Sequence, residues 1–145
     1  MQKRGPVILL CLLLCGSIAA GGHRYVRTSV LNTGKFVKIQ VRESGIYRIT
    51  YEALRDMGIN PQQVRILGYG GAMLNQDFSK SKIDDLPSVP FYMEKGSDGV
   101  FGAGDYIVFY GQGVTSWTYT GGRFSHTINP YSEYGYYFVS DNAGE

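Results

Sequence analysis

Residues 45–71 read GIYRITYEALRDMGINPQQVRILGYGG, and this stretch decides the fold. Its hydrophobic pattern changes from the alternation of a strand at 46–49 to the spacing of a helix near 51–57. It then returns to a short apolar strand at 64–67. The stretch therefore predicts a strand, a short helix and a second strand, and it contains no catalytic constellation.

The predicted helix carries its own start and stop signals. Thr50 is a favoured N-cap residue, because its hydroxyl can accept a hydrogen bond from a free backbone N–H of the first turn. Tyr51, Leu54 and Met57 share one helical face. Gly58 is expected at the C′ position, where a positive φ ends the helix. A helix this short must be held by packing.

Two further strands are expected before the helix. Residues 26–31 form a possible first strand, and residues 35–41 (KFVKIQV) alternate between apolar and polar side chains. Gly45 interrupts the alternation and is expected to supply the positive φ of a tight turn. We therefore predict a hairpin between 35–41 and 46–49.

The second half of the chain has the pattern of strands and turns. Residues 72–88 form a polar loop of a length that is often functional or mobile. Further strands are expected at 89–93, 105–110, 116–120, 124–127 and 134–140. Pro90 favours an edge position for its strand, whereas DYIVFY at 105–110 is apolar enough for a central one.

These elements predict an all-β domain, mainly an antiparallel β-sandwich-like fold with one short α-helix near 51–57. The chain has 20 glycines and 12 tyrosines, a composition typical of strands joined by tight turns. Gly121, Gly122 and Arg123 favour a hairpin between the flanking strands.

The first 21 residues are expected to be a signal peptide rather than part of the fold. They hold a basic start, a short apolar run and small residues, with cleavage expected after Ala19 or Ala20. The apolar run is short for a membrane span, which disfavours an uncleaved anchor. We expect a non-catalytic N-terminal β-rich domain over 22–145 that is truncated at its C-terminus.

Removing this leader changes the charge and the cysteine content. The chain has 14 basic and 12 acidic residues, and the loss of Lys3 and Arg4 leaves 12 of each. A neutral domain has no electrostatic footprint for nucleic acid. Cys11 and Cys15 both lie in the leader, so the domain has no thiol for a disulfide or a nucleophile. Lipid anchoring at Cys15 is disfavoured, because a small residue normally precedes a lipidated cysteine.

Four aspartates are candidates for a calcium site, and one histidine is a candidate for catalysis. Asp84, Asp85, Asp98 and Asp105 carry suitable oxygens, but their spacing fits no calcium loop, which favours turn formation. His126 follows Ser125 in a predicted strand, so the two side chains should point to opposite faces. The glycines at 68–71 are interpreted as turn positions. No catalytic, cofactor-binding or metal-binding residue is assigned.

Aromatic side chains are concentrated in the second half of the chain. Eight of the 12 tyrosines lie between Tyr92 and Tyr137, with Trp117, the single tryptophan, among them. Exposed aromatics would suit stacking on sugars or docking of a protein. The alternative, favoured by strand propensity, is that they lie in the core or on the sheet surface.

Five blocks occur in a fixed order: SGIYRITYEALRDMGI, VRILGYGGAML, DDLPSVPFY, GDYIVFYGQG and FSHTINPYSEYGYYFVS. Together with Trp117 they resemble the N-terminal region of the type IX secretion system sortases, a family of gingipain-like cysteine peptidases. The resemblance runs over about 31–140. It implies export to the periplasm or outer-membrane surface of a Gram-negative bacterium, with other secretion components or cargo proteins as partners.

In this family the peptidase cleaves C-terminal secretion signals from cargo, using a histidine and a cysteine in a later domain. No residue here corresponds to either, so the resemblance implies a non-catalytic module. The alternatives are a stand-alone secreted module that binds carbohydrate or protein, and an independent hydrolase built on Asp84, Asp85 and His126. The hydrolase is the least favoured.

Overall fold

The computed structural model describes residues 25–77, 79–80 and 82–144, so the expected leader, with Ala19 and Ala20, lies outside the described residues. The elements in chain order are β1 (Phe36–Val41), β2 (Gly45–Thr50), α2 (Tyr51–Asp56), the 3-10 helix η1 (Pro61–Gln63), β3 (Arg65–Leu67), β4 (Phe91–Glu94), β5 (Tyr106–Gly111), β6 (Thr115–Thr120), β7 (Arg123–Ile128) and β8 (Gly135–Ser140).

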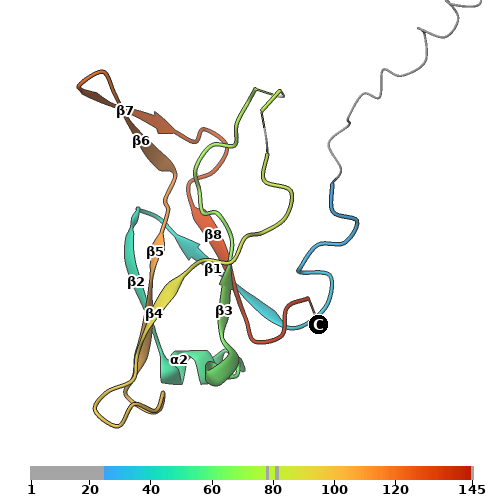
Figure 1. Cartoon of the computed structure of the whole chain (residues 1–145), viewed down its shortest axis with the longest axis vertical. Helices are drawn as coiled ribbons and strands as arrows, with labels where there is room; N and C mark the ends of the chain where they lie inside the picture. The colour runs from blue at the N-terminus through green and yellow to red at the C-terminus, as the bar shows by residue number, and fades with distance from the viewer. Residues whose placement is uncertain (1–24, 78, 81, 145) are drawn as a thin grey trace, which may run out of the picture.

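The strands form two antiparallel three-stranded sheets and a separate hairpin (Figure 1). One sheet has the order β1-β8-β3, the other has the order β2-β5-β4, and β6 pairs with β7. This arrangement confirms the predicted antiparallel class with one short helix. It also confirms a central position for the strand predicted at 105–110 and an edge position for the strand that follows Pro90.

The core lies between the two sheets and is built by their central strands. Phe109 of β5 and Tyr137 of β8 meet edge to face, with ring centroids 5.4 Å apart. Ile107 and Val139 flank them, and both are fully buried. Burying a side chain of this size stabilises a fold by about 1.5–3 kcal/mol. The sandwich is therefore held by apolar packing between β5 and β8.

Helix α2 closes one end of the sandwich, at the opposite end from the β6–β7 hairpin (Figure 1). The Thr50 hydroxyl accepts a hydrogen bond from the Ala53 N–H at 3.2 Å, as the sequence predicted. Leu54 is fully buried, and Gly58 has a φ of +69°. The helix ends at Asp56, and Met57 is its C-cap. The local capping signals were sufficient to predict this element.

The hairpin predicted between 35–41 and 46–49 is wrong. β1 pairs with β8 and β2 pairs with β5, so the two strands belong to different sheets. Gly45 is the first residue of β2 and does not have a positive φ. Alternation specifies which side chains are buried but not which strand supplies the hydrogen bonds. Here the apolar strands β5 and β8, far away in sequence, offer the larger buried surface.

The strand expected at 26–31 is also absent. Its backbone N–H groups are bound by carboxylates instead: Val26 N–H donates to Asp84 at 2.7 Å, and Val30 N–H donates to Asp85 at 2.6 Å. These side-chain acceptors replace a neighbouring strand, because a backbone donor needs a partner but not a backbone one. The segment therefore lies as a strap along the loop that contains the two aspartates.

Candidate functional site

The β6–β7 hairpin projects from the sandwich (Figure 1). None of its residues belongs to the hydrophobic core of the described chain. The predicted pairing of these strands is confirmed, with Trp117 opposite His126 and Tyr119 opposite Phe124. The ring centroids of these two pairs are 5.0 Å and 4.8 Å apart. Trp117 is 65% exposed. One face of the hairpin is thus an exposed aromatic ladder.

The other face of the hairpin is polar. Residues directly opposite in an antiparallel pair share a face, so Thr118 and Ser125 lie together and away from the aromatic ladder. This confirms that Ser125 and His126 point to opposite faces. The ring of His126 lies against Trp117, so the strand geometry excludes a dyad of Ser125 with His126.

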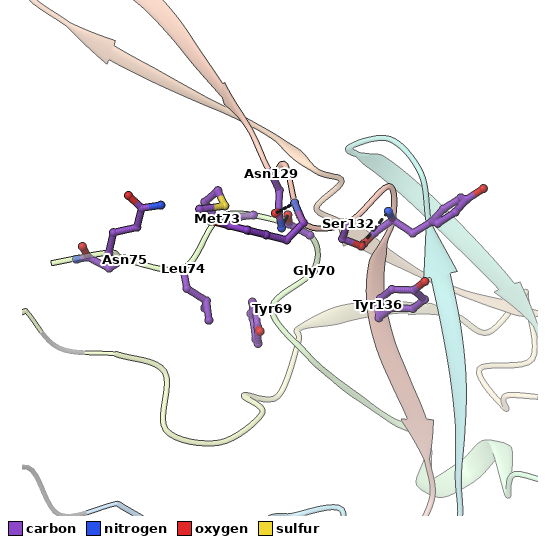
Figure 2. Close-up of a pocket in the computed structure, with 13 residues that line it drawn as sticks. Tyr69, Gly70, Met73, Leu74, Asn75, Asn129, Ser132 and Tyr136 are labelled. Carbon is purple, nitrogen blue, oxygen red and sulfur yellow. Dashed lines mark hydrogen bonds between the residues drawn. The ribbon is translucent and has the colours of Figure 1, made fainter. Parts of the chain in front are cut away.

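A pocket lies where the hairpin joins the sandwich. It is lined by residues 69–76 together with Asn129, Tyr131, Ser132, Tyr134 and Tyr136, and its volume is about 630 Å³. We call it the tyrosine pocket. Figure 2 shows that Tyr69 and Leu74 come from the loop after β3, whereas Ser132 comes from the loop before β8 and Tyr136 from β8 itself. Its size is in the range of small-molecule sites.

Glycines allow the loop after β3 to lie directly on the sandwich. A Cβ at Gly70 would come within 2.5 Å of the Gln112 carbonyl oxygen, and a Cβ at Gly71 within 2.9 Å of Gly135 Cα. Gly71 N–H donates to the Gln112 carbonyl at 3.0 Å. These glycines were predicted as turn positions, and the structure adds that Gly70 and Gly71 allow a close approach to the sandwich. The floor of the pocket is therefore fixed to β5 and β8.

The second wall of the pocket is braced by its own side chains. Asn129 donates from Nδ2 to the Gly71 carbonyl at 2.9 Å, and its Oδ1 accepts from the Tyr131 N–H at 3.0 Å. The Ser132 hydroxyl donates to the Tyr134 carbonyl at 2.8 Å. The Asn129–Gly71 bond joins the two loops to each other, and the other two bonds fix the conformation of the loop at 129–134.

The four aspartates that are candidates for a calcium site accept hydrogen bonds from backbone N–H groups instead. Asp98 accepts from Val100 N–H at 2.9 Å, and Asp105 accepts from Gly102 N–H at 2.8 Å. Asp84 and Asp85 hold the strap at 26–30. Within residues 25–77, 79–80 and 82–144, no three histidine, cysteine or acidic side chains gather as metal ligands would.

Most of the tyrosines between Tyr92 and Tyr137, and Trp117, are not buried. Their exposure is compatible with a binding role. Tyr92, Tyr110, Trp117, Tyr119 and Tyr131 are exposed, and Tyr137 alone of the tyrosines from Tyr92 onward is buried. The tyrosine pocket itself was not foreseen. Its loops are far apart in sequence, and the one available signal was the length of the 72–88 loop.

These features define a β-sandwich module with an exposed aromatic hairpin and a tyrosine-lined pocket. Among the helices that the structure describes, none is long and apolar enough to pass through a membrane. No protein-family model matches the chain, and no curated protein does.

Comparison with solved structures shows which protein this chain is related to. The chain is similar to PorU from Porphyromonas gingivalis, in the crystal structure of its dimeric latent form, with 41% sequence identity and a TM-score of 0.66. The similarity covers 80% of this chain but 10% of that PorU chain. The chain is therefore a PorU-related region, as the ordered blocks in the sequence had indicated.

Proposed function

We propose that this chain is the N-terminal, non-catalytic module of a type IX secretion system sortase. In such a protein a downstream cysteine-peptidase domain would cleave C-terminal secretion signals from cargo at the outer membrane. The single observation that supports this best is the 41% identity to PorU over 80% of the chain. The proposed organisation is a signal peptide at 1–21 followed by a β-rich module at 22–145.

The surface of the module suits a docking role in such a protein. Its two cysteines, Cys11 and Cys15, precede the module, so it brings no thiol nucleophile. Its exposed aromatic ladder has the residue types that dominate protein interfaces, since tryptophan and tyrosine bury large area at low entropic cost. We propose cargo or other secretion components as partners, at the periplasmic or outer-membrane surface of a Gram-negative bacterium.

Two measurements test this proposal. The coding DNA beyond the Glu145 codon is expected to continue into a domain with a catalytic histidine and cysteine, and an immediate stop codon would refute the sortase assignment. In the source organism, deletion of residues 116–127 removes the hairpin but no core residue. We expect cargo to retain its C-terminal signal on immunoblots. Normal processing in that strain would contradict a docking role for the hairpin.

A second candidate is a stand-alone secreted module that binds carbohydrate or protein. The exposure of Trp117 and of most of the tyrosines after Tyr92 favours it. This candidate requires ligand binding by the isolated chain, whereas the sortase proposal does not. Titration of the purified chain with ligands separates the two.

A further inference from the structure

We propose that the tyrosine pocket binds a neutral saccharide, with one sugar ring seated in the pocket. The inference deepens the second candidate function, on which it rests, by naming a site and a ligand class. It does not depend on the downstream peptidase.

The lining of the pocket carries no charged side chain. It consists of tyrosine, glycine, alanine, methionine, leucine, serine and amide residues. An anionic or cationic ligand would lose its hydration without gaining a counter-charge, which is unfavourable. Two lysines lie beside the lining: the Lys38 ammonium is 3.8 Å from the centre of the Tyr136 ring, and Lys82 lines a neighbouring hollow that shares Tyr69 with the pocket. The site therefore favours a neutral ligand.

The pocket offers both stacking surfaces and free hydrogen-bonding groups. Among the described residues, the hydroxyls of Tyr69, Tyr131, Tyr134 and Tyr136 form no hydrogen bond, and neither does the side chain of Gln76. Tyr131 is 82% exposed. A sugar ring has apolar C–H faces and a rim of hydroxyls, so it can stack on a tyrosine ring while its hydroxyls bind phenols and amides.

The pocket also continues into a second hollow. Asn129, Tyr131 and Ser132 line both. The second hollow is further lined by Thr115 and Ile128 and, unlike the tyrosine pocket, by charged side chains, those of Arg42, Glu43 and Glu133. Thr115 and Ile128 are paired and lie on the aromatic face of the hairpin. The surface is therefore continuous from the tyrosine pocket to the foot of the aromatic ladder.

A saccharide and a protein partner would bind different parts of this surface. A protein partner needs about 800 Å² on each side, and it would have to use the exposed ladder of Trp117, Tyr119 and Phe124. A saccharide needs only the preformed pocket, whose loops are joined by the Asn129 bonds. The two ligands thus depend on different aromatic residues.

The test uses the full chain, expressed with its own leader and purified after export, so that the leader is removed by the cell. Binding is measured by isothermal titration calorimetry with linear neutral tetrasaccharides of glucose, mannose, galactose and N-acetylglucosamine. At least one tetrasaccharide is expected to bind. Tyr131→Ala and Tyr136→Ala are each expected to weaken binding at least tenfold. Tyr131→Phe retains the ring and should weaken it less.

Matched controls use exposed aromatics outside the pocket. Tyr92, on β4, is 62% exposed, and Tyr92→Ala should leave the affinity unchanged. Trp117→Ala should also leave it unchanged. Thermal unfolding of each variant shows that it is folded. Tyr131 is more exposed than any other large hydrophobic residue described, so its replacement does not disturb the core.

The possible results test the pocket assignment and the saccharide proposal separately from the sortase proposal. Loss of binding in Tyr131→Ala but not in Trp117→Ala supports the proposal. Loss in Trp117→Ala alone overturns the pocket assignment and leaves a binding module that uses the hairpin. Binding of an unstructured control peptide at the pocket, or of no tetrasaccharide at millimolar concentration, overturns the saccharide proposal. In both of these cases the sortase proposal is unaffected.

Discussion

The Gln112 backbone N–H donates a hydrogen bond to the Tyr137 hydroxyl oxygen across 2.8 Å, and this bond joins the two sheets of the sandwich. Tyr137 lies on β8, the central strand of one sheet, and Gln112 follows β5, the central strand of the other. Burial raises the pKa of Tyr137, so the phenol stays neutral at ordinary pH.

Replacement of Tyr137 by phenylalanine should therefore destabilise the fold. The ring packing with Phe109 is kept, but the Gln112 N–H loses its acceptor, which costs about 1–3 kcal/mol for a buried donor. Urea unfolding followed by circular dichroism measures the change. The control is Tyr92→Phe, whose hydroxyl bonds only to the exposed Glu94 at 3.3 Å. Equal stability of the two variants would show that the inter-sheet bond contributes nothing.

Gly70→Ala should be more damaging than Gly99→Ala, although both glycines have a positive φ, of +79° and +71°. The backbone strain of a non-glycine residue is common to both variants. Only at Gly70 would the new Cβ collide, with the Gln112 carbonyl oxygen at 2.5 Å and the Tyr137 hydroxyl at 2.6 Å. Nothing lies within 4 Å at Gly99.

We expect Gly70→Ala to lose about 1–3 kcal/mol more stability than Gly99→Ala, as overpacking commonly costs. Urea midpoints of the two variants give the difference directly. Saccharide binding should also weaken in Gly70→Ala, because the pocket floor moves. If the two variants unfold at the same midpoint, the close approach of the loop to the sandwich is not tight.

The strap at 26–30 should detach in acid. The backbone N–H of Val30, and then that of Leu86, hold the pKa of the Asp85 carboxyl below its usual value. Because the folded pKa is lowered, this carboxylate contributes stability above its unfolded pKa of about 4. That contribution is lost as the pH falls through the lower folded pKa.

Hydrogen exchange of the Val30 amide, followed by mass spectrometry, measures this detachment. Protection relative to the intrinsic rate should fall as the solution is acidified below about pH 4. Asp85→Asn should show the same loss at neutral pH. Asp98→Asn is the matched control, because Asp98 accepts from Val100 within its own turn and joins no distant segments. Unchanged protection in Asp85→Asn would refute the strap.

The single tryptophan reports on the hairpin. Trp117 is exposed, so its fluorescence in the native chain should be quenched by acrylamide almost as strongly as that of free indole. Trp117→Ala should change stability by no more than about 0.5 kcal/mol, as is usual for surface positions. Phe109→Ala, in the core, should cost about 3–5 kcal/mol. A shielded tryptophan would mean that the hairpin folds back onto the sandwich.

Local features of the chain were predictable because their causes are local. The Thr50 cap, the buried Leu54 face and the positive φ of Gly58 all depend on residues within one or two helical turns. The β6–β7 hairpin was predictable for the same reason, since Gly121 and Gly122 specify a tight turn between neighbouring strands. The ordered sequence blocks also pointed to the relationship with PorU.

What the sequence by itself determined is the set of strands, the helix and the side chains each would bury. Only the tertiary structure decided which strands pair. The alternation of β1 is satisfied equally by β2 and by β8, and the choice of β8 depends on burial summed over the whole sandwich. The tyrosine pocket is a consequence of that choice. Tyr69 and Tyr136 share one pocket because β3 and β8 are neighbours in the sheet.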